Sequence, residues 1–232
     1  MYKTWAAIAT TVFMLTGMAQ ASDRLVVIEL FTSQGCSSCP PADALLGELS
    51  TRDDVLPLAL HVDYWDYIGW KDEFADPAYT KRQKAYARVK GDRTIYTPQM
   101  IVGGTDHVIG YKPMKLAMLI ERHGDTTAPV DVEVARDGQT LRISARAVAA
   151  VEGTMILQLV SYRAESTVNI RRGENAGRTL TYHNVVTRMV ELGRWDGLAR
   201  HSVTAEIPED GEYAVLVQSD GHGPILGAAR VP

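Results

Sequence analysis

The sequence predicts an α/β domain, in which helices flank a mixed sheet, followed by an all-β, sandwich-like domain. Up to about residue 124, apolar runs with strand character alternate with helical patterns. Beyond residue 130, short alternating segments are separated by glycine-bearing turns at intervals typical of a sandwich. The polar stretch Gly124–Pro129 lies between the two parts. We therefore expect domains at 22–126 and 127–232.

The first part contains strand and helix patterns in alternation. Leu25–Thr32 is rich in β-branched and apolar residues, which predicts a buried strand. Apolar residues recur at helical spacing from Pro41 to Leu49, with Asp43 and Glu48 expected to face solvent. A strand, a helix, two strands and a helix are predicted to follow: Val55–Val62, Asp76–Lys90, Gln99–Val102, His107–Gly110 and Pro113–Arg122.

The second part reads as strands throughout, without a convincing helix. Val130–Val134 and Leu141–Ala145 alternate strictly, and Asp137-Gly138 between them is a hairpin turn. Further strands are predicted at Thr154–Arg163, Thr179–Glu191, Ser202–Ile207, Glu212–Gln218 and Ile225–Val231. The polar segment Arg171–Asn184 is interpreted mainly as a turn, without a catalytic role.

Composition restricts the class of protein. The chain has 232 residues, of which 46% are hydrophobic and 22% charged, and this balance is typical of a globular protein. Its formal net charge of −4 gives no broad electrostatic reason to bind nucleic acid or an anionic membrane. We therefore expect no nucleic-acid partner, and the sequence leaves the oligomeric state open.

The N-terminal segment 1–21 has the pattern of a secretory signal peptide. Lys3 supplies a positive charge, Trp5–Thr16 is apolar, and Ala19-Gln20-Ala21 is a small-x-small cleavage site. Cleavage would leave a periplasmic or secreted protein with no membrane segment. Such a compartment permits disulfides.

Cys36 and Cys39 are the only cysteines of the chain. They lie where the first predicted strand turns into a helix, and the N–H groups and dipole of a helix N-terminus stabilise a thiolate. A zinc site would need a second pair of ligands, which the sequence lacks. The pattern therefore predicts a thiol–disulfide enzyme, with a static structural disulfide as the alternative.

Together with Thr97-Pro98 before a later strand, this strand, motif and helix resemble the thioredoxin superfamily. More closely, the segments Glu29–Asp43 and His61–Trp70 resemble an uncharacterised family of bacterial secreted thioredoxin-like proteins. The resemblance extends from about Leu25 to the C-terminus. It implies a thioredoxin-like first domain but no settled reaction.

The superfamily resemblance also implies roles for individual residues. Cys36 is the expected nucleophile and Cys39 the resolving thiol. Ser37-Ser38 stands between them where reductant members have Gly-Pro, and the two hydroxyls are expected to favour an oxidant or isomerase by lowering the pKa of Cys36.

Three further residues receive roles from the same resemblance. Pro98 is expected to be cis, and Thr97 to offer backbone groups to an extended substrate peptide. Glu29 is a candidate for a buried carboxylate that shuttles the proton of Cys39. The alternative for Glu29 is pairing with a cation or exposure to solvent.

An aromatic segment follows the second predicted strand. Trp65, Tyr67 and Trp70 are expected to bind a substrate polypeptide, because aromatic side chains dominate binding surfaces. The alternative is a small satellite core. His61 and Asp63 are expected either to tune Cys36 or to be ordinary structural polar residues.

The leading hypothesis is a thiol–disulfide oxidoreductase that acts on protein cysteines, uses no cofactor and needs a redox partner. One alternative is a copper-binding or copper-delivery protein, with Cys36, Cys39 and His61 as ligands suited to Cu(I). Another is a binding module without catalysis, since a fold does not determine function.

Overall fold

The computed structural model describes residues 24–208 and 210–232. Within them the chain is mostly β, with three α-helices and one short 3-10 helix. The first half contains β1 (Val26–Thr32), α1 (Pro40–Leu49), β2 (Val55–His61), η1 (Asp66–Ile68), α2 (Pro77–Lys90), β3 (Gln99–Val102), β4 (Asp106–Ile109) and α3 (Pro113–Gly124). The second half contains β5 (Val130–Asp137), β6 (Thr140–Ala147), β7 (Met155–Asn169), β8 (Thr179–Trp195), β9 (His201–Glu206), β10 (Glu212–Ser219) and β11 (Ile225–Arg230).

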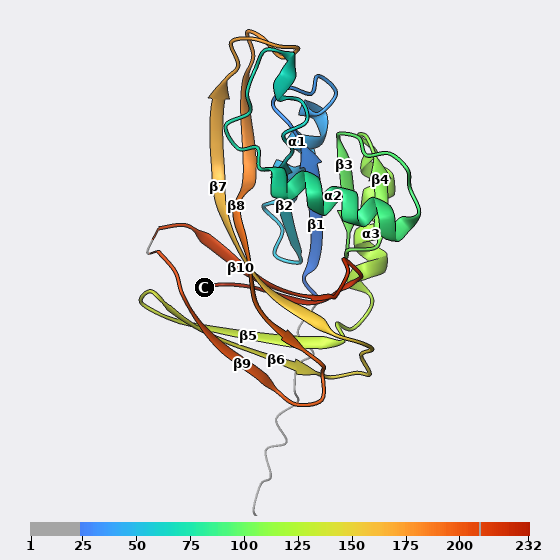
Figure 1. Ribbon diagram of the computed structural model, residues 1–232, viewed down its shortest axis with the longest axis vertical. Helices are drawn as coiled ribbons and strands as arrows, with labels where there is room; N and C mark the ends of the chain where they lie inside the picture. The colour runs from blue at the N-terminus through green and yellow to red at the C-terminus, as the bar shows by residue number, and fades with distance from the viewer. Residues whose placement is uncertain (1–23, 209) are drawn as a thin grey trace, which may run out of the picture.

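The strands form two sheets. The larger has eight strands in the order β11-β10-β7-β8-β2-β1-β3-β4, and the smaller has three in the order β5-β6-β9. In the larger sheet β1 runs parallel to β2 and antiparallel to β3. Strands from both halves of the sequence therefore share one continuous sheet (Figure 1).

The predicted fold class is wrong in this respect. The chain is not a thioredoxin-like α/β domain followed by a separate β-sandwich, because β7, β8, β10 and β11 extend the sheet of the first half. Alternating patterns identify strands but do not say which edges pair. The strands themselves lie close to their predicted positions, although β7 and β8 run to Asn169 and Trp195, well past the predicted ends. The segment 1–21 lies outside the described residues.

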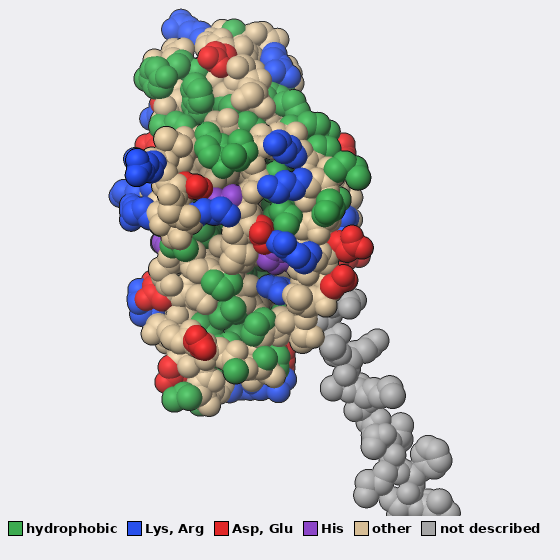
Figure 2. Space-filling view, turned by 90° about the vertical axis from the view of Figure 1, so that its right-hand side faces the viewer, with side chains coloured by type: hydrophobic (Ala, Val, Ile, Leu, Met, Phe, Trp, Pro, Cys, Tyr) green, Lys and Arg blue, Asp and Glu red, His purple; other side chains and the backbone are tan. Residues whose placement is uncertain are grey.

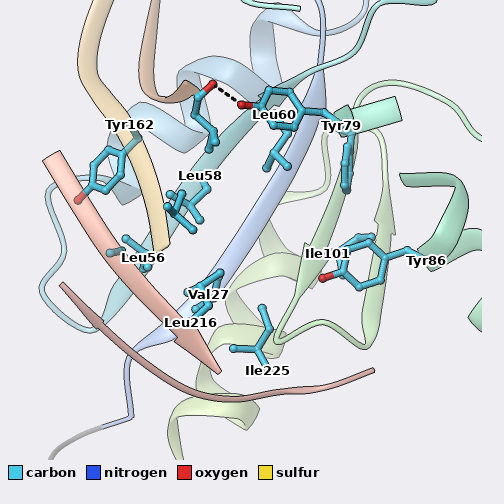
Figure 3. Close-up of a cluster of buried hydrophobic side chains, with 14 of the residues drawn as sticks. Val27, Leu56, Leu58, Leu60, Tyr79, Tyr86, Ile101, Tyr162, Leu216 and Ile225 are labelled. Atoms are coloured by element: carbon cyan, nitrogen blue, oxygen red, sulfur yellow. Dashed lines mark hydrogen bonds between the residues drawn. The ribbon is translucent and has the colours of Figure 1, made fainter. Parts of the chain in front are cut away.

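The core of the larger sheet lies on both faces of β1, and every residue of this strand is buried. Val27 and Phe31 belong to one cluster of buried side chains, shown in part in Figure 3 with Leu56, Tyr86 and Leu216. Val26, Ile28 and Leu30 belong to a second cluster, which includes Ala42, Leu46 and Leu49 of α1. Because successive side chains of a strand point to opposite faces, α1 covers only the second of these faces.

The smaller sheet packs against the lower part of the larger one (Figure 1). Leu141 and Ile143 of β6 share a cluster with Leu157 of β7 and Val215 of β10. A Cβ atom at Gly227 would lie only 2.4 Å from the carbonyl oxygen of Val130. Glycine is therefore needed where β11 approaches β5.

The edge formed by β4 and α3 exposes several large apolar side chains: Ile109, Tyr111, Met114 and Met118. On this side of the molecule hydrophobic groups are interspersed with charged ones (Figure 2). Among the described residues, no helix has the length and hydropathy that crossing a membrane requires.

Candidate functional site

The two cysteines form a disulfide at the entrance to α1. Cys36 and Cys39 are bonded, with their Cα atoms 5.4 Å apart, in the loop between β1 and α1. Cys39 is the N-cap of α1, and Pro40 begins the helix, a position where proline is favoured because its missing N–H has no partner there anyway. The Ser38 hydroxyl lies 3.5 Å from the sulfur of Cys36. The predicted pairing of these cysteines is thus confirmed, whereas their catalytic role stays a prediction.

Both sulfur-bearing residues are almost inaccessible. Cys36 is 1% exposed and Cys39 is 0% exposed, although Ser37 and Ser38 between them are exposed. The tip of the β7–β8 hairpin, the segment with η1 and the loop after β1 come together at the upper end of the molecule in Figure 1. The disulfide, which lies in the loop after β1, is therefore at this end of the molecule.

A buried carboxyl lies one helical turn after Cys39. Asp43 is on the inner face of α1, not exposed as its position in the pattern predicted, and its N–H donates to the carbonyl oxygen of Cys39. The Thr32 hydroxyl donates to Asp43 Oδ1 at 2.7 Å, whereas Oδ2 has no partner among the described residues. Burial raises the pKa of Asp43 to about 7, against the smaller opposing effects of His61 and Thr32.

His61 and Asp72 form a second buried pair beside this carboxyl. His61 Nδ1 lies 2.7 Å from Asp72 Oδ2, and the N–H of Gln34 donates to the same oxygen at 2.8 Å. Burial alone would raise the pKa of Asp72, but His61 and the hydrogen bonds outweigh it, and the net shift is downward. His61 is therefore held in place by a carboxylate on the loop that follows η1.

Tyr182 of β8 completes what we call the buried polar cluster: Thr32, Asp43, His61, Asp72 and Tyr182. Its ring packs edge-on against His61 with the centroids 5.0 Å apart. Burial raises the pKa of Tyr182, and the charges of Asp43 and Asp72 add to this shift. Among the described residues, three polar atoms of the cluster lack a hydrogen-bond partner: Asp43 Oδ2, His61 Nε2 and the Tyr182 hydroxyl.

Glu29 lies on the opposite face of β1, away from α1. Its carboxylate accepts from Arg82 Nε at 2.6 Å and from the hydroxyl of Tyr86, and Gln218 hydrogen-bonds both Arg82 and Tyr86. Glu29 and Phe31 point the same way in the strand, and Phe31 packs with Tyr86. This placement corresponds to the ion-pair alternative and does not favour the proton-shuttling role predicted for Glu29.

Two of the predicted aromatic residues support the cysteine loop. Trp65 Nε1 donates to Thr97 Oγ1 at 2.7 Å, and a Cβ atom at Gly35 would lie 3.1 Å from that of Trp65. Trp70 Nε1 donates to Gln34 Oε1 at 2.7 Å. Tyr67 is 80% exposed on η1. Trp65 and Trp70 are thus anchored around the loop, and a role in substrate binding stays a prediction for all three aromatic residues.

Pro98 also lies at this end of the sheet. The Thr97–Pro98 bond is cis, as predicted. β3 pairs with β1 through Gln99 and Phe31, so continuing the register sets Pro98 opposite Thr32, at the end of the strand that leads into the cysteine loop. Among the described residues no hydrogen bond joins Thr97 or Pro98 to either cysteine.

The sequence interpretation missed the residues that cover the pair. Asn175, from the segment interpreted as a turn, donates from Nδ2 to the carbonyl oxygens of Gln34 and Cys36 at 2.9 and 3.0 Å. Glu174 Oε2 accepts from the N–H of Ser37 at 3.2 Å. The only sequence signal was an unusual density of polar side chains between two long strands.

The described residues give no support to the copper alternative. Within them, no group of three or more His, Cys, Asp and Glu residues is arranged to hold a metal ion. His61 Nδ1 is taken by Asp72, which leaves only Nε2 for another partner.

Fold and disulfide together define a mostly β protein with one buried C-x-x-C disulfide. The chain belongs to the family described as "Protein of unknown function (DUF1223)", whose model matches residues 27–218. It is similar to a protein of Agrobacterium tumefaciens known from an X-ray crystal structure, with 32% identity, a TM-score of 0.76, and coverage of 91% of this chain and 96% of that one.

A hypothetical protein of Pyrococcus horikoshii matches far less well, with 12% identity, a TM-score of 0.24, and coverage of 44% of this chain and 87% of that one. No curated protein matches the chain. The family thus supplies no reaction, and a function has to be argued from the site.

Proposed function

We propose that this protein is a thiol–disulfide oxidoreductase whose redox pair is Cys36 and Cys39. The observation that carries the proposal is the closed disulfide at the start of α1, one turn before a buried carboxyl with a pKa of about 7. A purely structural role is disfavoured by the short loop, because the stabilisation by a cross-link grows with the length of the loop that it closes.

In the proposed reaction a substrate thiolate attacks the sulfur of Cys36. A mixed disulfide forms, the bond between Cys36 and Cys39 breaks, and Cys39 leaves as a thiolate. A second substrate thiolate then attacks the substrate sulfur of the mixed disulfide, which releases Cys36 and oxidises the substrate dithiol to a disulfide. The cysteine pair takes up two electrons and two protons, and the reverse sequence reduces a substrate disulfide.

We assign to Asp43 the transfer of a proton to and from Cys39. It lies one turn along the same helix, and its pKa near 7 lets it give or take a proton at neutral pH. Thr32 fixes one carboxyl oxygen, which leaves the second free to exchange protons within the buried polar cluster. Asp43 thereby takes the place that the sequence suggested for Glu29.

In this proposal the substrates are cysteines of exported proteins, and a separate redox partner resets the pair. The signal-like segment 1–21 supports a periplasmic or secreted location, where disulfides are stable. No bound cofactor is needed, because the two sulfur atoms carry the electrons.

Exchange with a synthetic peptide that carries two thiols tests the proposal. We expect one peptide disulfide to form per oxidised protein molecule, with loss of the disulfide between Cys36 and Cys39. Reduced Cys39→Ser should accumulate a mixed disulfide with the oxidised peptide, whereas Cys36→Ser should not. Exchange no faster than between peptide and free glutathione, in both directions, would overturn the proposal.

A further inference from the structure

The tip segment, residues 170–178 between β7 and β8, lies over the cysteine loop. Most of the segment is exposed, including Arg171, Glu174 and Arg178. Two residues of the segment are buried: Asn175 is 1% exposed, and Ile170 is 2% exposed and packs with Val168, Tyr182 and Val185. Of these two buried side chains, Asn175 is the one that hydrogen-bonds the cysteine loop.

Asn175 uses its whole amide group in this contact. Nδ2 donates to the carbonyl oxygens of Gln34 and Cys36, and Oδ1 accepts from Arg178 Nη1 at 3.0 Å. Because each polar atom has a partner, the amide is held in one orientation. It joins the tip directly to the backbone of Cys36.

Two further contacts hold the tip segment against the residues beneath it. The N–H of Ser37 donates to Glu174 Oε2. Gly173 has a φ of +77°, and a Cβ atom there would lie 3.2 Å from that of Trp70. The tip thus approaches both the cysteine loop and the aromatic segment closely, where a larger residue would be strained.

Closure of the tip limits what can reach the sulfur atoms. Thiol–disulfide exchange requires the attacking sulfur to contact a disulfide sulfur, and here both cysteines are buried. A cavity of about 360 Å³ opens beside the first turn of α1, lined in part by Pro40, Asp43 and Arg178 but by neither cysteine. A substrate thiol that enters this cavity therefore still has to displace the tip before it contacts a sulfur atom.

We propose that the tip segment determines substrate class, so that the pair exchanges with thiols on small molecules or unfolded polypeptide and excludes cysteines fixed in folded proteins. This inference rests on the proposed function. Displacing the tip breaks the contacts of Asn175 and Glu174, and a bulkier substrate requires a wider displacement. In the covalent step the substrate thiolate bonds to Cys36, the disulfide opens, and Cys39 takes the leaving electron pair.

Rates of reduction of the oxidised protein test the inference. The three reductants are dithiothreitol, an unstructured dithiol peptide and a small folded protein with a surface dithiol, each normalised to its rate with oxidised glutathione. The wild type should react at least about tenfold faster with the peptide than with the folded protein, and Asn175→Ala should reduce this ratio to about twofold, because it removes two hydrogen bonds of the cover. Asn169→Ala, an exposed position on the same hairpin, is the matched control and should behave as wild type.

Equal acceleration of all three reductants by Asn175→Ala, or no change in the ratio, would overturn the inference. Failure of the proposed function gives a different result, since the disulfide would then resist every reductant. Hydrogen exchange on the wild type provides a test that needs no variant. The amides of 170–178 should exchange much faster than those of β10, and equally slow exchange in both would contradict a movable tip.

Discussion

Buried polar groups lie on both faces of β1, but they differ in how completely their polar atoms are hydrogen-bonded. On one face Glu29, Arg82, Tyr86 and Gln218 form a network in which the carboxylate meets a guanidinium and a hydroxyl. On the other face, Asp43 and the rest of the buried polar cluster keep three atoms without a hydrogen-bond partner among the described residues. Both groups are buried, yet only the second lies beside the disulfide.

This difference separates a structural carboxylate from a reactive one. A buried charge is stabilised when opposite charge and hydrogen bonds surround it, as at Glu29. A carboxyl that is buried without a cation in direct contact keeps its proton up to a higher pH, as at Asp43. Burial alone thus does not identify a catalytic acid. The charged and hydrogen-bonding groups around the carboxyl determine whether it keeps its proton.

The largest effect is expected on the paired face. Glu29→Gln should lower the free energy of unfolding by about 3–5 kcal/mol, because it leaves the buried guanidinium of Arg82 without its counter-charge. Urea unfolding measures this loss. The double variant Glu29→Met, Arg82→Met should lose less than the single one. A loss below about 1 kcal/mol for Glu29→Gln, as for an exposed ion pair, would remove the contrast between the faces.

Asp43→Asn should raise the free energy of unfolding, whereas Glu29→Gln lowers it, and the size of this increase should depend on pH. The folded-state pKa of Asp43 is raised from 3.8 to about 7, so its stabilising contribution is complete below pH 4 and is lost as the pH rises through 7. At pH 8 the variant should therefore be more stable than the wild type by up to about 4 kcal/mol, since a tenfold change in acidity between the unfolded and folded states corresponds to about 1.36 kcal/mol. Urea unfolding at pH 4, 6 and 8 checks this, and a difference independent of pH would refute it.

The smallest expected effect on stability comes from a matched pair of tyrosine substitutions, one on each face of β1, which compares the two faces most directly. Tyr86→Phe should destabilise the fold by about 1.5–3 kcal/mol, because it removes a hydrogen bond to a charged carboxylate. Tyr182→Phe removes a buried hydroxyl that lacks a partner among the described residues and should be neutral or stabilise by about 1 kcal/mol. Thermal unfolding of both variants measures the difference. Equal losses would show that the two faces are equally well paired.

The sequence predicted the elements of this fold better than their assembly. Strand and helix periodicity located β1, α1 and β3 within a residue or two. The pairing of β8 with β2 joins Val185 to Ala59, and no local pattern encodes a contact over that distance. The second half was therefore mistaken for a sandwich of its own, although four of its strands complete the larger sheet.

For the site, local motifs were informative and long-range partners were not. The C-x-x-C spacing predicted the disulfide, and the resemblance of Thr97-Pro98 to the thioredoxin superfamily implied the cis proline. Asp43 was expected to face solvent because helical spacing alone does not reveal that β8 also packs on α1. Asn175 reaches Cys36 across 139 positions of sequence, so its role as a cover emerges only from the fold.

The reduction potential of Cys36 and Cys39 is the decisive quantity for the proposed redox role. Thiol trapping in graded glutathione buffers gives the fraction of reduced pair at each potential. We predict a reversible midpoint within the span of known exchange proteins, about −120 to −270 mV. A disulfide that stays closed below about −300 mV would be structural, and it would contradict the proposal that this pair exchanges electrons with substrates.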